Sequence, residues 1–139
     1  MTNEELENLR LRAERDEPQG MYEYAQAIMP TNPTAADMYM ELAAQLGNPP
    51  ALEYMGDKHL AEGRYESAAR KFKAGAKAGL LDCSVKLAVM AMARNEAGAI
   101  KELEELAEAG VRSACVALAE YHKESGNKKQ YAYWRSLLK

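Results

Sequence analysis

The side chains of this sequence that could carry out chemistry are two histidines, two cysteines and a few adjacent carboxylates. A histidine can act as a general acid or base or bind a metal ion, but either role needs further polar groups on the same face. His59 and His122 lie 63 residues apart, and each follows a small residue by three positions, at Gly56 and Ala119. We therefore expect both imidazoles to pack between helices and to hold no metal ion.

The other reactive groups do not form the pattern of an active site. Cys83 and Cys115 lack the spacing of a zinc site and stand in Ala-rich helical sequence, so we expect buried, reduced thiols rather than a disulfide. The pairs Glu4–Glu5 and Glu104–Glu105 point about 100° apart on a helix, which favours a solvated face over a catalytic carboxylate pair. No phosphate-binding loop, His-Glu-x-x-His motif or nucleophile elbow occurs. We therefore expect no enzyme activity, no cofactor and no metal.

Composition limits the class of partner. The 139 residues, 47% hydrophobic and 28% charged, are typical of one globular domain. A formal net charge of -3 gives no overall attraction to nucleic acid or an anionic membrane. The basic residues around 70–77 include one aromatic ring, Phe72, which we expect to pack between helices and not to stack on bases as in single-strand binding. No apolar run reaches the length of a membrane span. The first twelve residues form an acidic and polar segment that does not resemble a secretory signal. We expect a cytoplasmic protein with neither a nucleic acid nor a membrane partner.

The spacing of apolar residues predicts helices throughout and no strand. Ala is abundant and β-branched residues are scarce, and apolar positions recur at i, i+3 and i+4 between Pro and Gly turns. Thr2, Thr34 and Asp82 stand where N-caps are expected. The predicted helices cover residues 3–16, 19–29, 34–46, the two halves of 51–79, 83–94, 97–109, 113–124 and 128–138.

The stretch 51–79 is the clearest copy of a unit that recurs four times. Turns at Asp16, Gly47, Gly79 and Gly110 are 31 or 32 residues apart. Each first helix holds a large–small pair: Tyr24–Ala25, Met55–Gly56, Leu87–Ala88 and Leu118–Ala119. Each second helix holds a small residue, at Ala36, Ala68, Ala99 and Ala132, followed by a larger one, at Met40, Phe72, Leu103 and either Trp134 or Leu137.

Columns that keep size rather than identity indicate a packing register, with small residues where helices cross and large ones filling the gaps. They predict an all-α fold, a right-handed superhelix (α-solenoid) of antiparallel helix hairpins with about nine helices. We expect one domain, 1–139, with a capping helix at 1–17 and repeats at 20–47, 51–79, 83–110 and 114–139.

The pattern resembles the tetratricopeptide repeat, whose large–Gly pair, downstream Ala and aromatic residue are matched here by Met55–Gly56, Ala68 and Phe72. It also resembles the related Sel-one-like repeat in Ala51, four before Met55, and in the ending Gly75-Ala76-Lys77-Ala78-Gly79. The resemblance covers nearly the whole chain. The turns within repeats are shorter than in Sel-one-like units, and the final Pro of a tetratricopeptide unit is absent. The resemblance implies a protein-binding scaffold.

In such a stack, the first helices line a concave groove. The resemblance implies that the groove is lined by residues three before, one after and four after the small residue of each pair. These are Tyr22, Gln26, Met29, Glu53, Asp57, Leu60, Val85, Val89, Met92, Val116, Glu120 and Lys123. The carboxylates at 53 and 57 replace the Lys and Asn that family members use to hold chaperone tails, so we do not expect that ligand.

The helix at 83–94 is apolar on more than one side. Val85, Val89 and Met92 form a strip besides the packing residues of that helix, so either the helix is buried on both sides or it exposes an apolar strip for a ligand. Our first hypothesis is a non-catalytic module that binds a protein segment in the groove, with this strip as anchor and with Glu53, Asp57 and Glu120 favouring basic residues.

The alternative is self-association into a homodimer through the last helix, 128–138. Its residues Tyr131, Tyr133, Trp134, Leu137 and Leu138 are more apolar than a solvent-exposed end requires.

Overall fold

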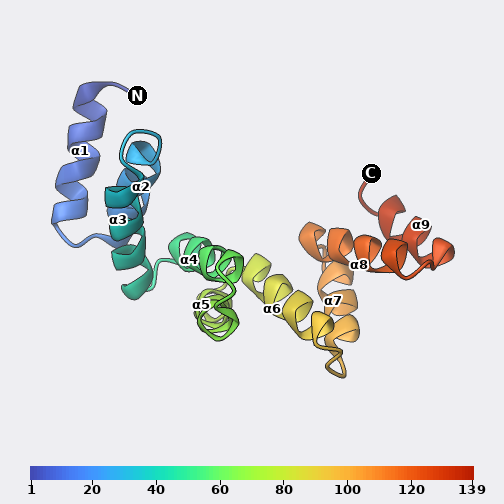
Figure 1. The fold of residues 1–139 in the computed structure, drawn as a ribbon. Helices are drawn as coiled ribbons and strands as arrows, with labels where there is room; N and C mark the ends of the chain where they lie inside the picture. The colour runs from blue at the N-terminus through green and yellow to red at the C-terminus, as the bar shows by residue number, and fades with distance from the viewer. The chain divides into compact units, whose positions relative to one another are not determined.

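The computed structural model describes all 139 residues and contains nine α-helices and no strand (Figure 1). The helices are α1 (Asn3–Glu14), α2 (Pro18–Ile28), α3 (Pro33–Gln45), α4 (Pro49–Ala61), α5 (Tyr65–Lys77), α6 (Leu81–Ala93), α7 (Ala99–Glu108), α8 (Arg112–Glu124) and α9 (Lys128–Ser136). The predicted all-α fold of about nine helices is confirmed. No helix has both the length and the apolar character that a membrane crossing requires. The chain forms two compact units, Met1–Leu80 and Leu81–Lys139.

Asparagine and proline set the beginnings of α3 and α4. The side chain of Asn32 accepts a hydrogen bond from the N–H of Ala35, and that of Asn48 accepts one from the N–H of Ala51. In both helices a proline follows at the first helical position, where its missing N–H costs nothing. The predicted cap at Thr34 is therefore wrong, because Pro33 has already begun the helix.

The other two predicted caps have different outcomes. Thr2 caps α1, since its hydroxyl accepts a hydrogen bond of 3.1 Å from the N–H of Glu5, as predicted. Asp82 lies within the first turn of α6, which begins at Leu81, so the prediction of a cap there is wrong. A carboxylate in the first turn still interacts favourably with the helix dipole, which accounts for the same sequence signal.

In the unit Met1–Leu80, each helix from α1 to α5 packs against the next. Its core is built from alanines and methionines, among them Met40 and Met55. At the crossing of α4 and α5, the ring of Phe72 lies directly on Gly56, where an added Cβ would come within 2.4 Å of the ring. This confirms the prediction that a small residue marks the crossing and that Phe72 fills the gap beside it.

In the unit Leu81–Lys139, α6 to α9 pack in the same consecutive manner around Leu103, Leu118 and Trp134. Trp134 is the buried large residue of α9, but Ala132 is exposed, whereas its predicted equivalents in the other repeats are buried. Residues two apart on a helix point about 200° apart, so Ala132 and Trp134 do not share a face. The assignment of Ala132 to the buried column is therefore wrong, and Gln130, four before Trp134, takes that side of α9.

Candidate functional site

The unit Met1–Leu80 has a groove of about 400 Å³ between α2 and α4, which we call the α2–α4 groove. It is lined by Tyr22, Gln26 and Met29 from α2, Met40 from α3, and Pro50, Glu53, Tyr54 and Asp57 from α4. Five of the six residues predicted to face a groove in this unit thus lie around one cavity. The sixth, Leu60, is half-buried and is not among the lining residues.

A buried asparagine joins the two helices that form this groove. Asn48 caps α4 through its side-chain oxygen, while its Nδ2 donates a hydrogen bond of 3.0 Å to Oε1 of Gln19 on α2. One side chain therefore fixes the beginning of α4 and its distance from the beginning of α2. Because Asn48 is buried, loss of either bond would leave a polar group without a partner. No local spacing in the sequence indicates this contact, because it joins residues 29 positions apart.

A polar network between α3 and α4 holds one wall of the α2–α4 groove. The hydroxyl of Tyr54 donates to Oδ1 of Asp37, and Nζ of Lys58 donates to Oδ2 of Asp37, both at 2.8 Å. The bonds from Lys58 and Tyr54 lower the pKa of Asp37. Burial and the neighbouring Asp37 raise the pKa of Tyr54 to about 12. Tyr54 is therefore a neutral donor at physiological pH with its ring fixed at the groove.

The α2–α4 groove combines apolar, aromatic and acidic side chains. Met29, Met40 and Pro50 are apolar, and the rings of Tyr22 and Tyr54 add flat aromatic surface. Polar groups come from Glu53, Asp57 and Gln26, whose Nε2 donates to the Tyr22 hydroxyl at 2.8 Å. The lining includes carboxylates but no Lys, Arg, His, Ser or Cys. Such a lining offers contact area and hydrogen bonds.

The unit Leu81–Lys139 has a similar groove of about 350 Å³ between α6 and α8, which we call the α6–α8 groove. It is lined by Val89, Met92, Ala93, Ala117, Glu120, Tyr121 and Glu124. Val85, in contrast, is 4% exposed and belongs to the core of this unit. Both possibilities left open for this helix therefore occur, since Val85 is buried in the core while Val89 and Met92 line a groove.

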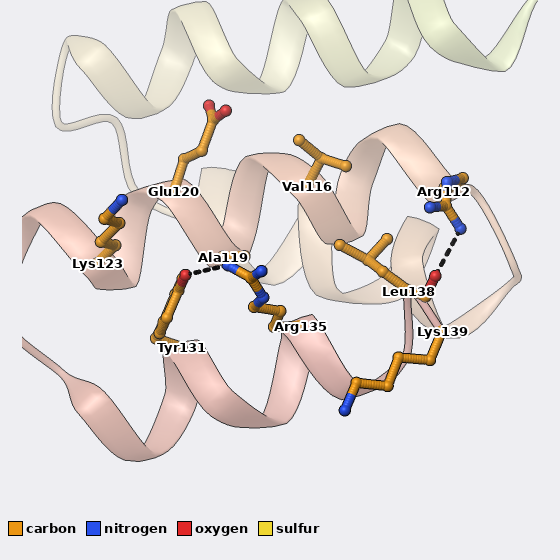
Figure 2. Close-up of a pocket in the computed structure, with 9 residues that line it drawn as sticks. All are labelled: Arg112, Val116, Ala119, Glu120, Lys123, Tyr131, Arg135, Leu138 and Lys139. Carbon is orange, nitrogen blue, oxygen red and sulfur yellow. Dashed lines mark hydrogen bonds between the residues drawn. The ribbon is translucent and has the colours of Figure 1, made fainter.

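A third cavity, of about 480 Å³, lies between α8 and α9 (Figure 2), and we call it the α8–α9 pocket. It is lined by Arg112, Val116, Ala119, Glu120, Lys123, Tyr131, Arg135, Leu138 and Lys139. The predicted residues Val116, Glu120 and Lys123 all lie here. The residues of α9 that line this pocket were not predicted, because the apolar character of α9 indicated only packing or self-association.

The histidines and cysteines occupy packing positions. Nδ1 of His59 has no hydrogen-bond partner and lies 3.9 Å from a carboxylate oxygen of Glu62. The ring of His122 makes an edge-on contact with Tyr121. Cys83 and Cys115 are buried and form no disulfide. No group of three or more His, Cys, Asp and Glu side chains is placed to hold a metal ion.

Comparison of the chain with protein-family models and with curated protein sequences finds no match.

Proposed function

We propose that this chain is a non-catalytic protein-interaction module, related to the tetratricopeptide and Sel-one-like repeats, that binds an extended segment of a partner protein in its α2–α4 groove. One observation carries the proposal. Five residues that the resemblance to the tetratricopeptide repeat implies for a groove, from two different helices, line one cavity of about 400 Å³. That volume is within the usual range of binding pockets, about 300–1,000 Å³.

The lining indicates the kind of segment. Met29, Met40 and Pro50 would accept an apolar side chain, and the Tyr22 and Tyr54 rings would contact the segment's backbone and side chains over a wide area. Glu53 and Asp57 favour a neighbouring Lys or Arg. The ligand we propose is therefore a segment with an apolar anchor next to a basic residue.

The α6–α8 groove suits the same ligand chemistry. Val89 and Met92 are half-buried apolar residues, and Glu120 and Glu124 contribute carboxylates to its lining. Val85 is left out of the proposed anchor because it is already covered by the core of its own unit. The proposed contact residues of this groove are thus Val89, Met92 and Glu120.

Peptide selection followed by one matched pair of variants tests the proposal. Peptides would be selected from a random display library on the full chain, and their affinities measured by fluorescence anisotropy. Gln26→Arg places a long cation in the α2–α4 groove, and Gln45→Arg makes the same change at another exposed glutamine, at the end of α3 and outside the groove. We expect Gln26→Arg to weaken binding about tenfold or more and Gln45→Arg to leave it unchanged.

Two results would count against this proposal. Equal binding by both variants, with unchanged circular dichroism, would place the peptide outside the α2–α4 groove. Selected peptides that keep their affinity when every Lys and Arg is replaced by Gln would remove the proposed preference for basic residues.

Self-association through α9 is the second candidate. Trp134, Tyr131 and Leu138 pack into the core of their own unit, which accounts for most of the apolar character of this helix. Tyr133 and Leu137 remain 49% and 50% exposed and lie four apart, on one side of α9. Light scattering after gel filtration would show a dimer that Leu137→Ser dissociates; a monomer at all concentrations would reject this candidate.

We also propose that the protein works in the cytoplasm. Two buried cysteines without a disulfide are compatible with a reducing compartment. Fluorescence microscopy of the tagged chain in its native cell would test this proposal.

A further inference from the structure

We propose that the α8–α9 pocket is a second binding site, separate from the α2–α4 groove, and that it takes an acidic segment of a partner protein with an apolar side chain between its Asp or Glu residues. This inference does not depend on the function proposed for the α2–α4 groove. It is based on three features of the pocket: the positive charge of its side chains, the absence of salt bridges to those side chains, and its apolar lining residues.

The rim of the pocket is strongly basic. The side chains of Arg112, Lys123, Arg135 and Lys139 line it, against a single side-chain carboxylate from Glu120. This concentration of positive charge stands in a chain whose formal net charge is -3, so it does not follow from overall composition. Figure 2 shows the Glu120 side chain directed away from Arg135 and Tyr131, so it does not neutralise that side of the pocket.

None of these four cations forms a salt bridge within the protein. The ion pairs of the structure involve other residues, mostly on α1 and between α3 and α4. Lys123 is exposed near the end of α8, and Lys139 is exposed next to Leu138. Like charges gathered on one rim repel one another, and an acidic ligand would relieve that repulsion.

The two arginines are held in place by neutral groups, which leaves their charge available. Nη1 of Arg112 donates to the carbonyl oxygen of Leu138 at 2.9 Å. Nη1 of Arg135 donates to the hydroxyl of Tyr131, and its guanidinium lies 5.7 Å from the centre of that ring (Figure 2). A guanidinium has five N–H donors, so each arginine keeps donors for a carboxylate while its orientation is already restricted.

Apolar side chains also line the pocket. Val116, Ala119 and Leu138 are among its lining residues, and Val116 is 38% exposed on the same side of α8 as Glu120 (Figure 2). An exposed valine among cations gains from contact with an apolar side chain and nothing from a phosphate backbone. The combination therefore favours a peptide over a nucleic acid.

The residues Val116, Glu120 and Lys123 are the register equivalents of Tyr22, Gln26 and Met29, which line the α2–α4 groove. The two cavities nevertheless carry opposite charge, since the α2–α4 groove has two carboxylates and no cation. Two copies of one repeat position thus present surfaces for ligands of opposite sign. A scaffold with such a pair of sites would bring a basic segment and an acidic segment together on one chain.

The test uses the full chain and a short fluorescein-labelled peptide in which one Leu is flanked by Glu residues, with binding followed by anisotropy. Lys123→Glu reverses a charge on the rim, and Lys128→Glu makes the same change at an exposed lysine of α9 outside the pocket. Val116→Ser removes an apolar side chain that lines the pocket. Its control is Leu42→Ser, at a residue of α3 that is also 38% exposed.

We expect Lys123→Glu to weaken binding about tenfold or more and Val116→Ser severalfold, with both controls unchanged and with affinity falling as salt rises. The proposal is overturned if each variant binds as tightly as its control. It is also overturned if a poly-Glu peptide without Leu, or a single-stranded oligonucleotide, binds as tightly as the Leu peptide, since either result means attraction to charge alone. Gln26→Arg would leave this binding unchanged, which separates a failure here from a failure of the α2–α4 proposal.

Discussion

The contact between Gly56 and Phe72 makes a sharp prediction about the unit Met1–Leu80. In Gly56→Ala, the new Cβ would lie 2.4, 2.7 and 2.9 Å from Cε1, Cδ1 and Cζ of the Phe72 ring. The ring is fully buried, so it has no solvent-facing space into which to move. The substitution therefore requires a shift of α5 relative to α4.

The expected loss follows from two opposing effects. Overpacking of a buried contact costs about 1–3 kcal/mol. Replacing a glycine inside a helix by alanine gains about 1 kcal/mol. We expect Gly56→Ala to lower the free energy of unfolding by up to about 2 kcal/mol, whereas the same change at a helix-interior glycine with open space around it would raise it.

A double-mutant cycle isolates the contact. Phe72→Leu removes the ring edge that meets the new Cβ, so in that background Gly56→Ala should be neutral or stabilising, with a coupling of about 1–2 kcal/mol. Urea unfolding followed by far-ultraviolet circular dichroism measures the stability. Trp134, the only Trp of the sequence, reports by its fluorescence on the other unit. An unchanged or higher stability of Gly56→Ala in the wild-type background would refute the reasoning.

Four further predictions concern single residues. Bonds from Lys58 and Tyr54 lower the pKa of Asp37, so the stability that they contribute is present above about pH 4 and is lost as pH falls through the folded pKa. In urea unfolding, Asp37→Asn should therefore cost about 1 kcal/mol at pH 7 and little at pH 2. The pKa of Tyr54 is raised to about 12, so its stabilisation is lost as pH rises from 10 to 12, and an absorbance titration should show one late tyrosine that Tyr54→Phe removes. Val85→Glu should unfold its unit by burying a charge, while Val89→Glu, at the α6–α8 groove, should keep the helical circular dichroism spectrum. The thiol of Cys115 is buried, so its reaction with a thiol reagent should become fast only in denaturant; fast labelling of the folded chain would contradict this burial.

The buried side of each helix could be predicted from the sequence, because apolar residues recur every three or four positions along it. Pairs such as Met55–Gly56 identify a buried stripe through spacings of three and four residues. Tyr22 and Gln26 were placed in the groove by the resemblance to the tetratricopeptide repeat. The ends of the helices were less accessible. Asn32 and Thr34 are both good capping residues, and the choice between them depends on the proline at position 33.

The sequence by itself determined the class of fold and the number of helices, because these depend on contacts within a helix or between successive helices. The resemblance to a known repeat implied most of the residues that line the α2–α4 groove, which lies between helices that are not successive. Only the tertiary structure decided which side chains meet across helices. It placed Asp37 between Tyr54 and Lys58, joined Asn48 to Gln19, and left Ala132 exposed. It also gathered Arg112 and Arg135 on one rim, because the side of α9 that faces α8 is set by the burial of Trp134 and not by any local spacing.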